Sequence, residues 1–337
     1  MTTATGATIL GCEGTDLSAA ERDFFRAADP WGFILFARNV ESPDQVRRLT
    51  ADLRGAVGRN APVFVDQEGG RVQRLRAPHW REWLPPLDQV AQSGGDAARA
   101  MYLRFRLIAA ELRDVGIDGD CAPTLDLATP GTHPFLRNRC YSDRVEVVTA
   151  VGRAVAEGLL AGGVLPVMKH MPGHGRATLD THHELPRVTE TADVLLASDF
   201  ATFHALRDLP LGMSAHIVFE AFDPDRPSTC SPRMVQVIRQ DIGFQGLLMT
   251  DDLSMQALSG SLGDRAAAAI GAGCDIALHC NGKRTEAEAV VDAAGRLSGA
   301  GLARAETALA ARRMPEPIDM AALEVEFAAL SEGRMHG

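Results

Sequence analysis

The chain has 337 residues, of which 46% are hydrophobic and 23% are charged, and its formal net charge at pH 7 is −10. These fractions are typical of a soluble globular protein, and the length suits either two domains or one large barrel. The negative charge argues against nucleic acid and against anionic membrane surfaces as partners.

Neither a membrane span nor a signal peptide is expected. The first apolar run is short and no positive charge precedes it, and no later run approaches about 18 apolar residues. The six cysteines form no C-x-x-C pair, and several lie in apolar runs. They are typical of reduced, buried thiols, so we expect a cytoplasmic protein.

Eight short apolar runs are spaced along the chain. Each has the length of a strand, and most are too apolar for a half-exposed strand, which favours a parallel sheet. They cover residues 7–12, 32–38, 62–68, 116–127, 164–170, 211–219, 246–252 and 274–280.

Amphipathic stretches typical of helices alternate with these runs, for example at 18–28, 42–57, 98–116 and 231–243. Two of them begin with serine followed by proline, which is a helix N-cap with proline at the first helical position. These pairs are Ser42–Pro43 and Ser231–Pro232, and Gly116 and Gly243 stand where two of the helices should stop.

Eight alternating strands and helices predict a single (β/α)₈ barrel, with residues 1–337 forming one domain. The segment after residue 284 is rich in alanine and is expected to close the barrel and add a C-terminal helical extension. A doubly wound open sheet is the alternative that the pattern leaves open.

Polar side chains follow four of the predicted strands, where the active site of a barrel lies. They are Asp66 to Arg71 after the third strand, Lys169–His170 after the fifth, Ser214 to His216 in the sixth, and Asp251–Asp252 after the seventh. Each alone could form a structural ion pair. Together they predict one site.

The segment 169–185 is long, rich in glycine, and contains four histidines. Asp180 and His182 are two residues apart, so in an extended segment the carboxylate can orient the imidazole. His183 is interpreted as a loop residue. Zinc is the rival interpretation, but the histidines lack H-E-x-x-H spacing and no nucleotide-binding motif follows a strand, so we expect no metal and no cofactor.

Five segments resemble glycoside hydrolase family 3, in order from about residue 8 to about residue 282. Within the family they are similar to the bacterial β-N-acetylglucosaminidases of peptidoglycan recycling, and K-H-x-P-G-H-G followed by D-[ST]-H is specific to that branch. The segments are FILFARN (33–39), VDQEGGRVQRL (65–75), KHMPGHG with DTH (169–182), MSAH (213–216) and TDDLSM (250–255).

The resemblance implies a role for each matching residue. Asp251 would be the nucleophile, and His182, oriented by Asp180, would be the general acid/base. A carboxylate and a proton donor are what retaining hydrolysis needs, and histidine titrates near neutrality. The residues that would bind the hydroxyls of the non-reducing-end sugar are Asp66, Arg74, Arg139, Lys169 and His170.

Three further positions belong to this comparison with the family. Arg139 would stand for the arginine of the family's R-S-[FY] pattern, although Cys140 replaces the serine. Asp252 and Glu68 are interpreted as structural, so each should have hydrogen-bond partners under the rim of the barrel.

The resemblance implies an exo-β-N-acetylglucosaminidase whose partner is a carbohydrate, and we expect a monomer. Its substrates would be muropeptides carrying N-acetylglucosamine linked to anhydro-muramic acid. Two alternatives stay open. One is a family 3 β-glycosidase or phosphorylase of other specificity, and the other is a sugar-binding barrel that has lost catalysis.

Overall fold

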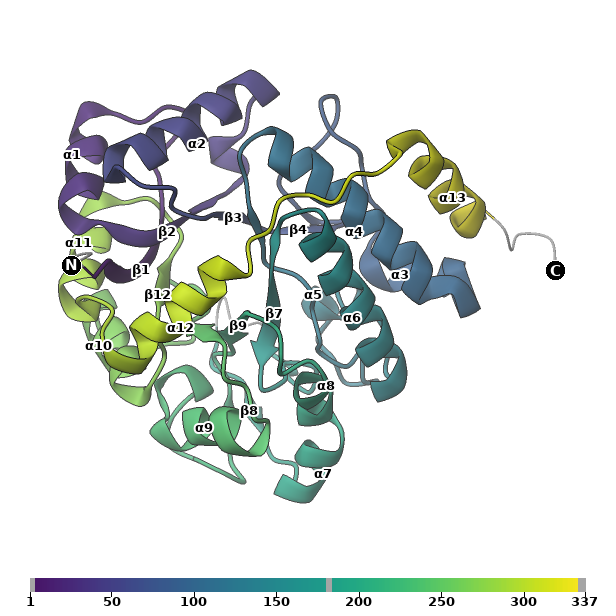
Figure 1. Ribbon diagram of the computed structural model, residues 1–337. Helices are drawn as coiled ribbons and strands as arrows, with labels where there is room; N and C mark the ends of the chain where they lie inside the picture. Colours follow the sequence, from purple (N-terminus) through teal and green to yellow (C-terminus); the bar gives the residue numbers. More distant parts are fainter. Residues whose placement is uncertain (1–3, 180–183, 333–337) are drawn as a thin grey trace.

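The computed structural model describes residues 4–179 and 184–332, and its centre is an eight-stranded parallel sheet (Figure 1). Along the sheet the strands lie in the order β11-β9-β7-β6-β3-β2-β1-β12. Their bounds are β1 Gly6–Gly11, β2 Pro30–Leu35, β3 Val63–Val65, β6 Gly119–Asp120, β7 Leu165–Met171, β9 Leu211–Ser214, β11 Leu247–Met249 and β12 Ala277–His279. All eight predicted strands are confirmed.

The two edge strands meet and close the sheet into a barrel. Met249 at the end of β11 bridges Ile276 just before β12, and the Thr250 amide donates to the Ile276 carbonyl at 3.0 Å. The predicted (β/α)₈ barrel is therefore confirmed, and the doubly wound open sheet is excluded.

Helices surround the barrel (Figure 1). Ser42 and Ser231 accept hydrogen bonds from the amides of Gln45 and Met234, which confirms both N-caps. The helices that precede β9 in the sequence are α1 Ala19–Ala28, α2 Pro43–Val57, α3 Pro86–Ser93, α4 Ala97–Asp114, α5 Pro134–Arg137, α6 Val145–Ala161, α7 Ala192–Ala197 and α8 Asp199–Ala205. Those after β9 are α9 Pro232–Gln236, α10 Leu262–Ala272, α11 Arg284–Ala294, α12 Gly299–Ala310 and α13 Met320–Glu332.

The helix predicted at 231–243 differs in one respect. Its second half is a π-helical turn, η4 (Val237–Asp241), and not a continuation of α9. Gly243 then ends the element with a φ of 81°, a left-handed conformation that glycine adopts without strain. Gly116 ends α4 with the same φ.

The C-terminal segment packs as a helical extension. Helix α11 lies against β1 and β12, α12 lies against β11, and α13 covers α3 and α4 (Figure 1). Phe327 of α13 meets Trp83 edge-on, with ring centroids 5.6 Å apart. Among residues 4–179 and 184–332, no helix is both long and apolar enough to cross a membrane.

Two small sheets accompany the barrel. Strands β8 (Arg187–Val188) and β10 (Val218–Phe219) pair in parallel, and β4 (Gln67–Gly69) and β5 (Val72–Gln73) form an antiparallel hairpin. The hairpin turns at Gly69 and Gly70, whose φ values are 109° and 58°. Such angles favour glycine, which explains the G-G pair of the motif.

Candidate active site

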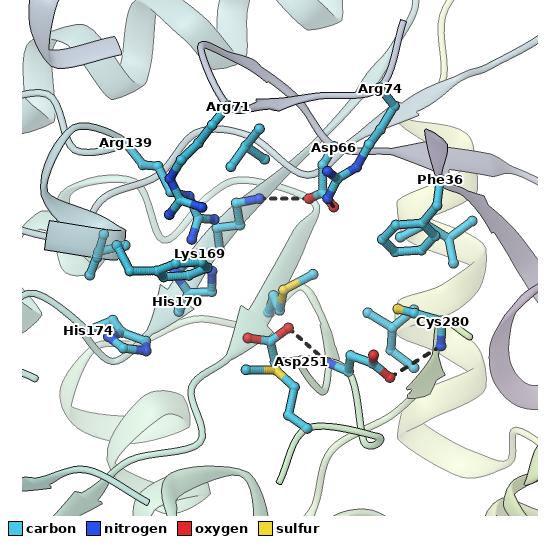
Figure 2. Close-up of a pocket in the computed structure, with 18 residues that line it drawn as sticks. Phe36, Asp66, Arg71, Arg74, Arg139, Lys169, His170, His174, Asp251 and Cys280 are labelled. Atoms are coloured by element: carbon cyan, nitrogen blue, oxygen red, sulfur yellow. Dashed lines mark hydrogen bonds and ion pairs between the residues drawn. The ribbon is translucent and has the colours of Figure 1, made fainter. Parts of the chain in front are cut away.

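A cavity of about 290 Å³ lies where the strands of the barrel end (Figure 2). Seven of the eight strands or the segments following them contribute to it. Three of the four predicted polar segments supply lining residues, whereas Ser214 to His216 do not line the cavity and the sixth strand contributes Met213 instead. Its walls are formed by Ile34, Phe36, Asp66, Arg71, Val72, Arg74, Phe135, Leu136, Arg139, Lys169, His170, His174, Met213, Asp251, Asp252, Met255, Leu278 and Cys280.

One wall holds a network of charged side chains around Lys169, which is 1% exposed. Its Nζ lies 2.9 Å from Asp66 Oδ1 and also contacts Glu68. Arg74 binds the second oxygen of Asp66 at 3.0 Å, and Arg139 binds both oxygens of Glu68, at 2.8 and 2.9 Å. All four sugar-binding candidates in this wall, Asp66, Arg74, Arg139 and Lys169, therefore belong to a single network.

The network keeps both of its carboxylates ionised. Burial alone would raise the pKa of Glu68, but Arg139 and Lys169 lower it to about 2. Burial likewise opposes ionisation of Asp66, and Lys169 and Arg74 hold its pKa well below the usual range. The pKa of Lys169 is raised despite its burial, because Asp66 and Glu68 stabilise the ammonium. Glu68 thus has the partners under the rim that the sequence predicted.

The segment that carries Asp66 and Glu68 is held by buried groups from outside the cavity. Asp120 accepts from the Gln67 amide at 3.0 Å, and Arg104 donates to the Glu68 carbonyl. Burial raises the pKa of Asp120 to about 7. A Cβ on Gly69 would lie 1.8 Å from the Arg104 guanidinium, so this glycine is required for the close approach.

Asp251 lies on the opposite side of the cavity from Asp66 and Lys169, at the end of β11 (Figure 2). Its Oδ1 accepts from the Asp252 amide at 2.8 Å. Burial would raise the pKa of Asp251, but the nearby His170 and His216 lower it, so the carboxylate is ionised. An ionised carboxylate facing a sugar-sized cavity is what a nucleophile requires.

Both oxygens of the Asp252 carboxylate are engaged in hydrogen bonds to neighbouring residues. It accepts from the Cys280 amide at 3.2 Å and from the Ser254 hydroxyl at 2.6 Å. These partners agree with its interpretation as a structural residue.

Two further residues contact groups around Asp251, and the family resemblance assigned a specific role to neither of them. Asp126, two residues after the β-bridge of Thr124, lies 2.7 Å from Nδ1 of His170 through its Oδ2. His216 is buried and donates through Nε2 to the Asp252 carbonyl at 3.0 Å. Asp126 was hidden in the apolar run 116–127, where it is one of three aspartates and nothing in the spacing singled it out.

Asp180 and His182 lie outside the described residues, as do Thr181 and His183. Within the described part of the chain, no group of three or more histidine, cysteine, aspartate or glutamate side chains could hold a metal ion.

The Glu68 ion pairs predict how stability depends on pH. The depressed pKa means that the carboxylate stabilises the folded state above about pH 4.5, and that this stabilisation is lost as the pH falls toward 2. A Glu68→Gln variant should lose on the order of 3 kcal/mol of unfolding free energy at pH 7. Its stability should then fall less than that of the wild type between pH 5 and pH 3.

Urea unfolding at pH 7, 5, 4 and 3 measures this difference. Glu82→Gln is the matched control, because Glu82 is half exposed and pairs with the exposed Arg76. Such a pair contributes little, so its pH profile should follow the wild type. Parallel profiles for Glu68→Gln and the wild type would contradict the prediction.

Comparison with known proteins agrees with this geometry. Residues 17–314 match the N-terminal domain of glycosyl hydrolase family 3. The chain is 37% identical over 305 residues to the β-hexosaminidase of Methylococcus capsulatus, covering 89% of this chain and 90% of that protein. It is 38% identical over 284 residues to the β-hexosaminidase of Alkalilimnicola ehrlichii, covering 82% of this chain and 81% of that protein.

Solved structures of similar proteins agree with this family assignment. NagZ from Neisseria gonorrhoeae in complex with N-trifluoroacetyl-D-glucosamine superimposes with a TM-score of 0.86 at 29% identity, covering 97% of this chain and 98% of that one. A family 3 β-N-acetylglucosaminidase from Paenibacillus gives 0.82 at 29% identity, and this chain covers 61% of its length. The chain therefore belongs to glycosyl hydrolase family 3 and is a glycoside hydrolase.

Proposed function

We propose that this protein is a retaining exo-β-N-acetylglucosaminidase with Asp251 as its nucleophile. The observation that carries the proposal is the ionised Asp251 carboxylate facing the Asp66–Lys169–Arg74 wall across a cavity of about 290 Å³. A cavity of this size is at the small end of ligand sites and suits one sugar ring. The β-hexosaminidase name of its relatives supports the same substrate class.

The wall opposite Asp251 would bind the sugar. Asp66 can accept hydrogen bonds from sugar hydroxyls, while Arg74, Lys169 and Arg139 can donate to them. Charge-assisted hydrogen bonds of this kind are short and strong. Because the wall is pre-assembled by its internal ion pairs, little reorganisation is needed when the sugar binds.

The reaction would follow two displacements. Asp251 attacks the anomeric carbon, the glycosidic bond breaks, and His182 gives its proton to the leaving oxygen. Water then attacks the glycosyl-enzyme, His182 takes the proton from that water, and the Asp251 carboxylate is released. Asp180 would orient His182, as the acid does in a catalytic triad.

We further propose muropeptides with non-reducing-end N-acetylglucosamine as the substrate, a monomeric state and a cytoplasmic location. The substrate follows from the resemblance of the K-H-x-P-G-H-G and D-T-H segments to peptidoglycan-recycling enzymes. All six cysteines are free and five of them are buried, which supports a reducing compartment.

Turnover of nitrophenyl N-acetyl-β-glucosaminide is the test, with nitrophenyl β-glucoside as the comparison. NMR of the first-formed sugar should show the β-anomer, as retention requires. Rates should be unchanged by a chelator and by inorganic phosphate. No turnover would indicate a sugar-binding protein, a preference for the glucoside would indicate another β-glycosidase, and acceleration by phosphate would indicate a phosphorylase.

A disaccharide of N-acetylglucosamine and anhydro-muramic acid, compared with chitobiose, tests the aglycone. The muropeptide proposal expects the first to have the higher kcat/KM. Equal values would reject muropeptide selectivity and leave the glycosidase assignment intact.

A further inference from the structure

The cavity contains a histidine whose tautomer is fixed by a buried carboxylate. Asp126 is 1% exposed and both of its oxygens are occupied. Oδ1 accepts from the backbone amides of His174 at 2.7 Å and His170 at 3.3 Å, and Oδ2 meets Nδ1 of the His170 ring at 2.7 Å. In each of these three contacts, a backbone or ring nitrogen approaches an oxygen of the Asp126 carboxylate.

The protonation of this pair follows from donor and acceptor rules. An ionised carboxylate can only accept hydrogen bonds, so Nδ1 of His170 must carry the hydrogen. Asp126 is ionised, because the low pKa favoured by His170 prevails over burial. Nε2 is then the ring nitrogen left for the cavity that His170 lines (Figure 2).

The position of this pair links it to Asp251. Asp126 binds the ring through Nδ1, and the same ring lowers the pKa of Asp251. Burial and the neighbouring His170 lower the pKa of the adjacent His174 to about 4. Within residues 4–179 and 184–332, the charged and titratable groups around the ring include Asp126, Lys169, His174, His216, Asp251 and Arg139.

We infer that Asp126 is a positioning residue for the reaction, which rests on the function proposed above. It holds His170 with Nδ1 protonated, which leaves Nε2 as the ring nitrogen available to substrate in the cavity that Asp251 also lines. Asp126 thereby fixes the orientation and the tautomer with which His170 meets the substrate.

Asp126→Asn tests this role without dismantling the loop. The amide oxygen can still accept from the two backbone amides, whereas the amide nitrogen donates to Nδ1 of His170. That exchange moves the ring hydrogen to Nε2. We expect kcat/KM to fall about 10- to 100-fold, the range found for groups that orient metal-ligating histidines.

Long-range ¹H–¹⁵N NMR of histidine-labelled protein reads the tautomer directly. In the wild type, Nδ1 of His170 should be protonated, and in Asp126→Asn it should not be; His170→Gln identifies the signals. The control is Asp118→Asn. Asp118 is a buried carboxylate that accepts from the Val63 amide at 2.7 Å and precedes β6, whereas Asp126 follows it. This control should leave the His170 tautomer unchanged.

An unchanged His170 tautomer in Asp126→Asn would overturn the inference and leave Asp126 as a loop-holding residue. The NMR result is independent of turnover. If the wild type cleaves no glycoside, the proposed function fails while the Asp126–His170 pair is still tested.

Discussion

Asp251→Ala is expected to abolish nearly all turnover while leaving the fold intact. Asp251 is the ionised carboxylate that faces the bound sugar in the proposed reaction, and it lies at the end of a rigid barrel strand. Without it the covalent route disappears, so kcat should fall by several powers of ten. Its only hydrogen bond within the described chain is with the adjacent Asp252 amide, so its loss should disturb few structural contacts.

Steady-state rates with nitrophenyl N-acetyl-β-glucosaminide measure the loss, and thermal unfolding reports on the fold. Asp251→Asn is the matched variant, because it keeps an acceptor for the Asp252 amide and removes the nucleophile. Both variants should be inactive and folded. Retention of more than about a tenth of the wild-type kcat would reject the assignment, since that loss corresponds to only ~1.4 kcal/mol of barrier.

The barrel was predictable because its signals are local. Each strand is an apolar run bounded by polar residues, and serine–proline pairs and terminal glycines delimit helices such as α2 and α9. The convergence of Asp66, Lys169 and Asp251 was also predictable, because parallel strands bring their carboxyl ends to one face. The strand pattern, together with the rule that barrel sites lie at the carboxyl ends of the strands, predicted where these side chains meet.

Pairing between distant residues was not predictable. The bidentate contact between Glu68 and Arg139 joins residues 71 positions apart, and no spacing in the sequence indicates it. Asp126 was missed for a related reason: inside an apolar run its charge gave no indication of the partner, which comes from the next strand. The π-helical turn at η4 likewise depends on packing, which the helical pattern of 231–243 does not contain.

His182→Ala is expected to impair substrates with poor leaving groups far more than those with good ones. The proposed acid matters when the departing oxygen is basic, whereas a nitrophenolate departs with little help. Formation of the glycosyl-enzyme from a nitrophenyl substrate should therefore survive, but its hydrolysis would lack a base. We expect a burst of nitrophenolate followed by slow turnover, and acceleration by azide, which attacks without base assistance.

Pre-steady-state kinetics with and without azide, on nitrophenyl and disaccharide substrates, test this prediction. His183→Ala is the matched control and should behave as the wild type, while Asp180→Ala should be a weaker version of His182→Ala. Equal losses on both substrates, with no burst and no azide effect, would make His182 a binding or structural residue. Glu68 could not then replace it, because Arg139 and Lys169 hold its pKa at about 2 and it has no proton to donate near neutrality. The exposed Glu184 would be the next candidate to test.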